Sequence, residues 1–171
     1  VLPLAAVPVF AQQQSERRVV QSPILTIDSD RVFNESAFGL RVADDVETQS
    51  AEISAENRLI EADLKAEERK LTDQRSKLSP DAFSGLADAF DEKVQKTRAA
   101  QAAKGRALNE LVEKERQVFL AAAGPVLEQM MREAGAAVIL ERRSVFVSAN
   151  AIDITDEAIE RLDASVGSGK N

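Results

Sequence analysis

The 171-residue chain contains seven Phe but no Trp, Tyr, His or Cys, and its formal charge is −7. Without His and Cys it lacks the commonest general base, the commonest metal ligand and any thiol nucleophile, so neither an enzyme activity nor a cofactor is expected. The acidic balance disfavours nucleic acid as a partner, because neutralising phosphates requires a basic face. A charged fraction of 30% with only 7 Gly and 5 Pro favours long helices.

The first eleven residues are apolar and uncharged, and a polar run begins at Gln12. This is the pattern of the end of a secretory signal peptide with cleavage near Ala11, which predicts export. The alternative is a hydrophobic tail or weak membrane anchor, although a span needs about 20 residues. Residues 12–22 are polar without periodicity and predict a disordered N-terminus, and the same reasoning predicts a disordered tail over 165–171.

The first structural elements expected are a strand and a short helix. The β-branched run 24–28 predicts a buried strand, and the helix over 29–38 should end near Gly39. Residues 40–77 contain neither Gly nor Pro, which predicts a helix about 57 Å long at 1.5 Å per residue.

A break at Ser79-Pro80 follows, with Ser79 suited to cap a second helix and Pro80 to begin it. This returning helix is expected to reach residue 123, where Gly124-Pro125 should bend or interrupt it, and to stop finally at Gly135.

The last third of the chain predicts two strands and one helix. Residues 137–141 and 144–148 form apolar runs joined by Arg142-Arg143, which predicts a β-hairpin, and Thr155 should cap a helix over 156–163. All strands then lie near the two chain ends. For these strands to share one sheet, the helical segment between them must extend away from the sheet and return to it. The predicted fold is α+β, mainly α: a long antiparallel helical hairpin, residues 44–118, on a small β body formed by residues 23–43 and 119–164.

Charge patterning gives a test of the hairpin. Folding about Pro80 brings together residues whose numbers sum to about 160, so the basic run 93–106 faces the mostly acidic segment 54–67. Opposite charges are therefore expected to meet, and such exposed pairs set register more than stability. The alternative is that the basic run is merely a solvated helix face.

The apolar seam of the hairpin is interrupted by polar residues along both helices, including Asn57, Glu67 and Gln101. This predicts helical but loosely joined, compliant arms, or a mediocre coiled coil that a partner helix completes. Near the turn, four apolar residues lie among acidic ones, and they either close the turn as a small core or contact clients. These client-contact candidates are Leu78, Phe83, Leu86 and Phe90.

Three stretches together resemble the Skp/OmpH family of outer-membrane-protein chaperones: ILTIDSDRVFNES, KLSPDAFSGLADAFDEKV and AAVILERRSVFVSANAIDITDEAIERLD. The resemblance covers residues 24–164. It implies a homotrimer whose strands form a shared barrel-like body, from which three hairpins extend as tentacles around a cavity. It also implies an ATP-independent periplasmic holdase that captures unfolded outer-membrane proteins and passes them toward the outer membrane.

The resemblance also assigns partners and an oligomerisation surface. The partners are unfolded outer-membrane proteins and further copies of the chain, with transient contact with a membrane surface as an additional option. Trimerisation would remove the exposed edges that strands from one chain leave. The residues matching the family's body strands are Ile24, Leu25, Ile27, Val138, Ile139, Leu140, Val145, Phe146 and Val147.

In one respect the sequence departs from the family, whose tentacles are often basic. Residues 44–118 hold 13 basic and 17 acidic side chains, a net charge of −4. We therefore expect clients to be held by apolar contacts with weak salt dependence, and the lipopolysaccharide-binding cluster proposed for the family has no clear counterpart. Two alternatives stay open: an exported coiled-coil adaptor that docks one partner, and a cytosolic tentacled chaperone of prefoldin type.

Overall fold

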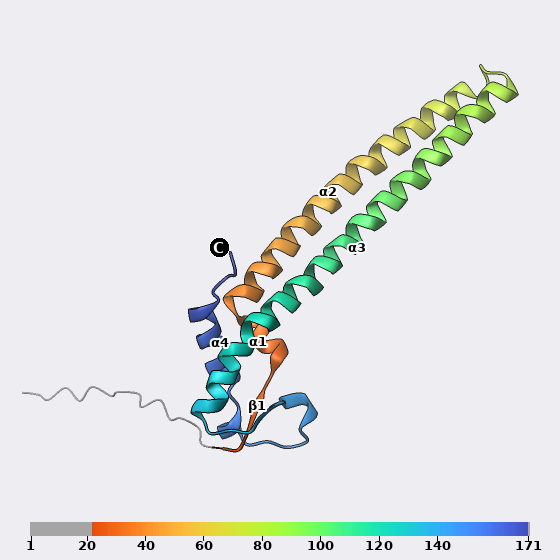
Figure 1. Ribbon diagram of the computed structural model, residues 1–171. Coiled ribbons are helices and arrows are strands. Elements are labelled where there is room, and N and C mark those ends of the chain that lie inside the picture. Colours follow the sequence, from red (N-terminus) through yellow and green to blue (C-terminus); the bar gives the residue numbers. More distant parts are fainter. Residues whose placement is uncertain (1–21, 171) are drawn as a thin grey trace, which may run out of the picture.

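The computed structural model describes residues 22–170, so the predicted signal segment and residues 12–21 of the predicted disordered N-terminus lie outside the described residues. A small body carries a long arm of two antiparallel helices (Figure 1). The elements are β1 (Ile24–Ile27), α1 (Ser29–Glu35), α2 (Ala37–Gln74), α3 (Pro80–Glu133), β2 (Val138–Glu141), the 3₁₀ turns Arg142–Ser144 and Asn150–Ile152, and α4 (Thr155–Ser165). The α+β, mainly helical fold class is confirmed.

The body is built on a two-stranded sheet that joins the two ends of the chain. β1 and β2 pair in parallel, with Ile24 opposite Val138 and Thr26 opposite Leu140. A single bridge from Thr26 to Asp153 covers the other edge of β1. Within residues 22–170 the outer edge of β2 therefore has no strand beside it.

The predicted β-hairpin is wrong, because residues 144–148 form no strand in the described chain. A two-residue hairpin turn needs residues that accept positive φ, such as Asn-Gly, and Arg142-Arg143 does not supply them. Instead the chain makes a 3₁₀ turn directly after β2. Arg142 is held by an ion pair with Asp153, and Arg143 lies 2.5 Å from Asp30, so both side chains bind the body.

The first helix ends earlier than predicted, at Glu35. Ser36 has extended backbone and caps α2, and its hydroxyl accepts a hydrogen bond from the Gly39 amide at 3.2 Å. Gly39 is thus in the first turn of α2 and does not end a helix. A Cβ there would lie 1.7 Å from the carbonyl oxygen of Phe33, so glycine allows α2 to approach the end of α1 closely.

The helix-start prediction at the turn is confirmed. Gly124-Pro125 was expected to bend or interrupt the returning helix, and the interruption is wrong. The Ser79 hydroxyl accepts the Ala82 amide at 3.3 Å, and Pro80 begins α3. α3 then continues through Pro125 to Glu133. Buried residues on both sides of the proline pack on the body, and these tertiary contacts offset the lost backbone hydrogen bond. Gly135, with φ of 65°, ends the helix as predicted.

The hydrophobic core lies where the arm joins the body. Phe119 of α3 is 1% exposed, and its ring centroid is 5.2 Å from that of Phe33 and 5.3 Å from that of Phe38. Leu25 of β1 and Leu162 of α4 complete the same cluster. The core uses no residue between Val46 and Phe119, so beyond the Arg116–Asp30 ion pair at its base the arm is held by its own two helices.

The last part of the chain is ordered against the body, so the predicted disordered tail is wrong for residues 165–170. Gly167 and Gly169 have positive φ and turn the chain back toward α2, where the Ser168 carbonyl accepts a 2.7 Å hydrogen bond from Arg41. Thr155 also differs from its predicted capping role, because its hydroxyl accepts the Asp28 amide at 2.9 Å and so fastens α4 to the end of β1.

Candidate functional site

The described residues, 22–170, contain no group of three or more acidic side chains placed to hold a metal ion. No helix in the same range is long and apolar enough to cross a bilayer. The candidate functional regions are the apolar surfaces of the arm and of the body.

The register of the arm agrees with the charge pattern. Lys104 forms an ion pair with Glu56, and Lys93 forms one with Glu67, and both pairs sum to 160 as predicted. The hydrogen bond from the Lys104 ammonium holds the pKa of Glu56 below its ordinary value. These exposed ion pairs set the alignment of the two helices but contribute little to the stability of their packing.

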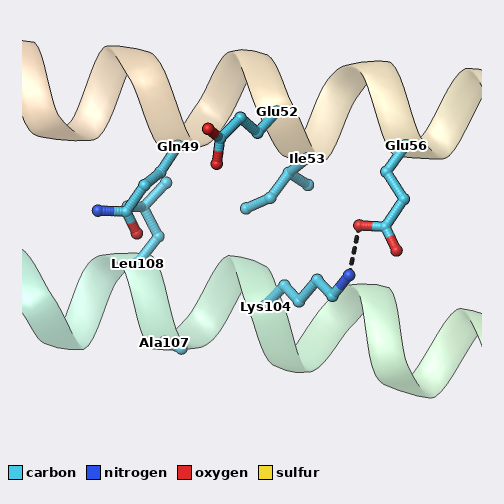
Figure 2. Close-up of a pocket in the computed structure, with 7 residues that line it drawn as sticks. All are labelled: Gln49, Glu52, Ile53, Glu56, Lys104, Ala107 and Leu108. Carbon is cyan, nitrogen blue, oxygen red and sulfur yellow. Dashed lines mark hydrogen bonds and ion pairs between the residues drawn. The ribbon is translucent and has the colours of Figure 1, made fainter.

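The seam between the arm helices is incompletely filled. One hollow has a volume of about 330 Å³. Figure 2 shows Ile53 of α2 and Leu108 of α3 among its lining residues, beside the Glu56–Lys104 pair. A second hollow of about 590 Å³ nearer the turn is lined by Leu64, Phe90 and Val94 with charged residues around them. At the first hollow Lys104 occupies a seam position, and a charged side chain cannot interdigitate as an apolar knob does.

The structure divides the four predicted client-contact residues into two pairs. Phe83 and Phe90 are half-buried along the seam, and the Arg75 guanidinium lies 5.7 Å from the Phe83 ring centroid. Leu78 and Leu86 are exposed. The phenylalanines therefore help to close the turn, while the two leucines present apolar surface to solvent.

An exposed leucine in the middle of the arm was not singled out by the sequence analysis. Leu59 of α2 is 68% exposed, and Leu40, Val118 and Leu120 near the base of the arm are also exposed. Seam periodicity directs attention to residues that face the partner helix, and Leu59 lies off that stripe. The apolar character of Leu59 on an otherwise charged stretch of helix was the available signal.

The nine predicted oligomerisation residues also separate by exposure. Leu25 and Ile27 are buried in the chain's own core, and Ile139 and Val145 are half-buried. Alternation along the paired strands places Ile24, Val138 and Leu140 on the opposite face of the sheet. The set that stays open to solvent, called here the exposed body residues, is Ile24, Val138, Leu140, Phe146 and Val147.

Ion pairs brace the body behind this face. Asp30 of α1 lies between Arg116 of α3 and Arg143 of the turn after β2. The hydrogen bond from Arg116 is the main reason that the pKa of Asp30 is lowered. The loop that carries Phe146 is thus anchored at its start, although the Phe146 side chain itself is fully exposed.

These features define a small β-containing body with a projecting antiparallel helical arm. The family model described as outer membrane protein (OmpH-like) matches residues 23–162, so the chain belongs to the OmpH-like family, as the sequence resemblance predicts. One similar solved structure is a proposed outer membrane chaperone (OmpH-like) from Caulobacter crescentus. It shares 20% identity at a TM-score of 0.75, covering 85% of this chain and 86% of that one, which shows a common fold. Comparison with curated proteins gave no match.

Proposed function

We propose that this chain is an ATP-independent holdase chaperone of the periplasm. It would bind unfolded outer-membrane proteins between its arms, prevent their aggregation and deliver them toward the outer membrane. Membership of the OmpH-like family supports a chaperone role in general. The observation that carries the proposal is the arm itself, which extends beyond the core while exposing apolar side chains such as Leu59.

Self-association into a homotrimer is part of the proposal. The exposed body residues form apolar surface that a lone chain leaves in water, and the outer edge of β2 has free backbone groups within the described chain. Unpaired edges and apolar faces are usually covered in native proteins. Packing against further copies would cover both and would place several arms around one space.

Client capture would rest on many weak contacts. A fully buried Leu contributes about 1.5 to 3 kcal/mol, so the exposed leucines of one arm offer only modest affinity. Several arms acting on one polypeptide raise the effective concentration of these contacts. The net charge of −4 over residues 44–118 gives no attraction for acidic clients, so binding should depend weakly on salt.

The test is an aggregation assay with stoichiometry. A denatured outer-membrane β-barrel protein is diluted from urea, without nucleotide, in the presence and absence of the chain, and light scattering and sedimentation are followed. The proposal expects suppressed scattering and one client for every three chains. Unchanged scattering with a well-folded oligomer present would overturn it and favour an adaptor that docks one specific partner.

Matched variants locate the contacts. Replacing the exposed leucines together, as Leu59→Ser, Leu78→Ser and Leu86→Ser, should weaken holdase activity while leaving helix content unchanged. The control is Ala62→Ser, Ala89→Ser and Ala99→Ser, which introduces the same hydroxyls at exposed positions on α2 and α3. Equal activity of the two triple variants would exclude the leucines as the contact surface.

A further inference from the structure

Arg41, in the second turn of α2, joins three separate segments of the chain. Its side chain is 15% exposed and forms ion pairs with Asp45, at 3.0 Å, and with Glu115 of α3. Its Nε donates to the Ser168 carbonyl oxygen at 2.7 Å, and its guanidinium carbon lies 4.6 Å from the Phe38 ring centroid. A planar donor with several N–H groups suits this role, because one side chain can satisfy several acceptors at fixed angles.

The segment that reaches Arg41 follows directly from α4. The amides of Val166 and Gly167 both donate to the Leu162 carbonyl oxygen, and Gly167 then reverses the chain with φ of 57°. Gly169, with φ of 69°, lies so close to Phe38 that a Cβ there would be 2.4 Å from the ring. Figure 1 shows the end of the chain beside the start of α2.

The same region contains the weakest point of α3. Pro125 has no amide hydrogen, so the helix lacks one backbone hydrogen bond there, and prolines are the commonest site of helix bending. A Cβ on the neighbouring Gly124 would meet no atom within 4 Å, so nothing packs against that side of the helix. Core packing of Ala123 and Met130 holds α3 on both sides of this point, and any further contact that spans it restricts bending more.

α4 contacts α3 on the body side of that point, and the segment after α4 reaches α3 on the arm side through Arg41 of α2. On the body side, Arg161 of α4 forms a 2.6 Å ion pair with Glu133. On the arm side, Ser168 holds Arg41, and Arg41 holds Glu115. Two fixed attachments on either side of a flexible point restrict rotation about it.

We propose that α4, residues 166–170 and Arg41 form a brace across Gly124-Pro125 that sets the direction in which the arm leaves the body, with Arg41 as the positioning residue. The inference rests on the proposed function in one respect: the direction of the arms would set the width of the space in which a client is held. The leverage is large: Pro80 to Pro125 spans about 68 Å at 1.5 Å per residue, so a turn of about 10° at the proline moves the tip by about 12 Å.

The experiment measures arm direction in the intact chain without client. Because the chain has no Cys, Asp63→Cys on the arm and Ala151→Cys on the body introduce one pair of spin labels at exposed positions. Labelled chains are diluted with unlabelled chains, and the distance distribution is recorded by pulsed electron resonance. Circular dichroism confirms that each variant is folded.

Arg41→Gln and Gly169→Val should each broaden the distribution by about twofold or more, since both detach the brace from α2. The controls are Arg69→Gln, an exposed arginine of the same helix, and Ser168→Ala, which keeps the carbonyl that Arg41 uses. Adding Pro125→Ala to Arg41→Gln should narrow the distribution again, because it restores the missing helical hydrogen bond.

A parent-like distribution in both brace variants would overturn the inference, as would an Arg41→Gln distribution that Pro125→Ala leaves broad. Gly169→Val acts outside the helices, so it decides the question if Arg41→Gln proves poorly folded. Holdase activity is not the readout. An unchanged arm direction therefore leaves the proposed function standing, and an absent holdase activity leaves the brace standing.

Discussion

Replacing Phe146 gives the cleanest test of self-association. The Phe146 side chain is 102% exposed relative to its reference, so it buries no surface within its own chain. Replacing it therefore removes no stabilising contact from a lone chain. Phe146→Ser should therefore leave helix content and the unfolding of the individual chain unchanged. Any effect of the substitution must then come from contact with another molecule.

The expected magnitude follows from the area that becomes buried. Burying one Phe side chain contributes about 1.5 to 3 kcal/mol, so three symmetric copies contribute about 5 to 9 kcal/mol to a trimer. Since about 1.4 kcal/mol corresponds to a tenfold change, the trimer dissociation constant should rise by roughly three to six powers of ten. An assembly stable at micromolar concentration would then dissociate into single chains.

Sedimentation velocity over a range of chain concentrations measures this directly. Leu59→Ser is the control, because Leu59 is an exposed apolar residue on the arm rather than the body. Parent and control should sediment as the same oligomer, and Phe146→Ser as a smaller species. If Phe146→Ser sediments like the parent, the loop after β2 does not lie in the interface and the burial argument is refuted.

Three further predictions concern the arm and the core. The pKa values of Asp30 and Glu56 are lowered in the folded chain, so their stabilisation is present above the unfolded values, near 3.8 and 4.5, and is lost as pH falls through the folded ones. The melting temperature should therefore drop below about pH 4.5, and a loss confined to higher pH would contradict this. Glu56→Lys should lower the melting temperature by repulsion with Lys104, and adding Lys104→Glu should restore it; failure to restore it would argue against the observed register. Phe119→Ala should lower the free energy of unfolding by about 3 to 5 kcal/mol in urea titration, and a loss below about 1 kcal/mol would contradict its place in the core.

The arm was predictable because its helix start depends on local sequence, and because the position of the turn determines which residues of the two antiparallel helices face each other. Ser79 and Pro80 are a helix start in any context, and the turn that they define predicts which charges meet. The pairs Lys104–Glu56 and Lys93–Glu67 follow from that one position. Both strands that form also lie where β-branched runs indicate them.

The body was less predictable because its outcome depends on tertiary contacts. The run Val145 to Val147 has strand-forming residues, yet a strand requires a neighbour, and the ion pairs of Arg142 and Arg143 direct the chain away from β2. Pro125 lies within a helix because residues on both sides pack in the core. Neither the path of residues 145–147 nor the helical position of Pro125 can be predicted from local sequence alone.

The candidate surfaces were predictable as lists of apolar residues but not as exposed sets. Alternation separates Leu25 from Ile24 only once the strand partner is known. Residues 165–170 read as a polar, glycine-containing tail, whereas Gly167 and Gly169 are the positions at which the chain turns back to Arg41. A glycine in a flexible tail and a glycine in a required turn look the same in a sequence.

The parallel pairing of β1 with β2 makes the arm an insertion into the body. The start of α2 and the returning part of α3 lie together at the base of the arm, where the ring centroids of Phe38 and Phe119 are 5.3 Å apart. Removing seven residues from each helix, at equal distances from Pro80, would shorten the arm by about 10 Å and keep the seam in phase. Arm length is thus a dimension that evolution or an engineer can vary without altering the body.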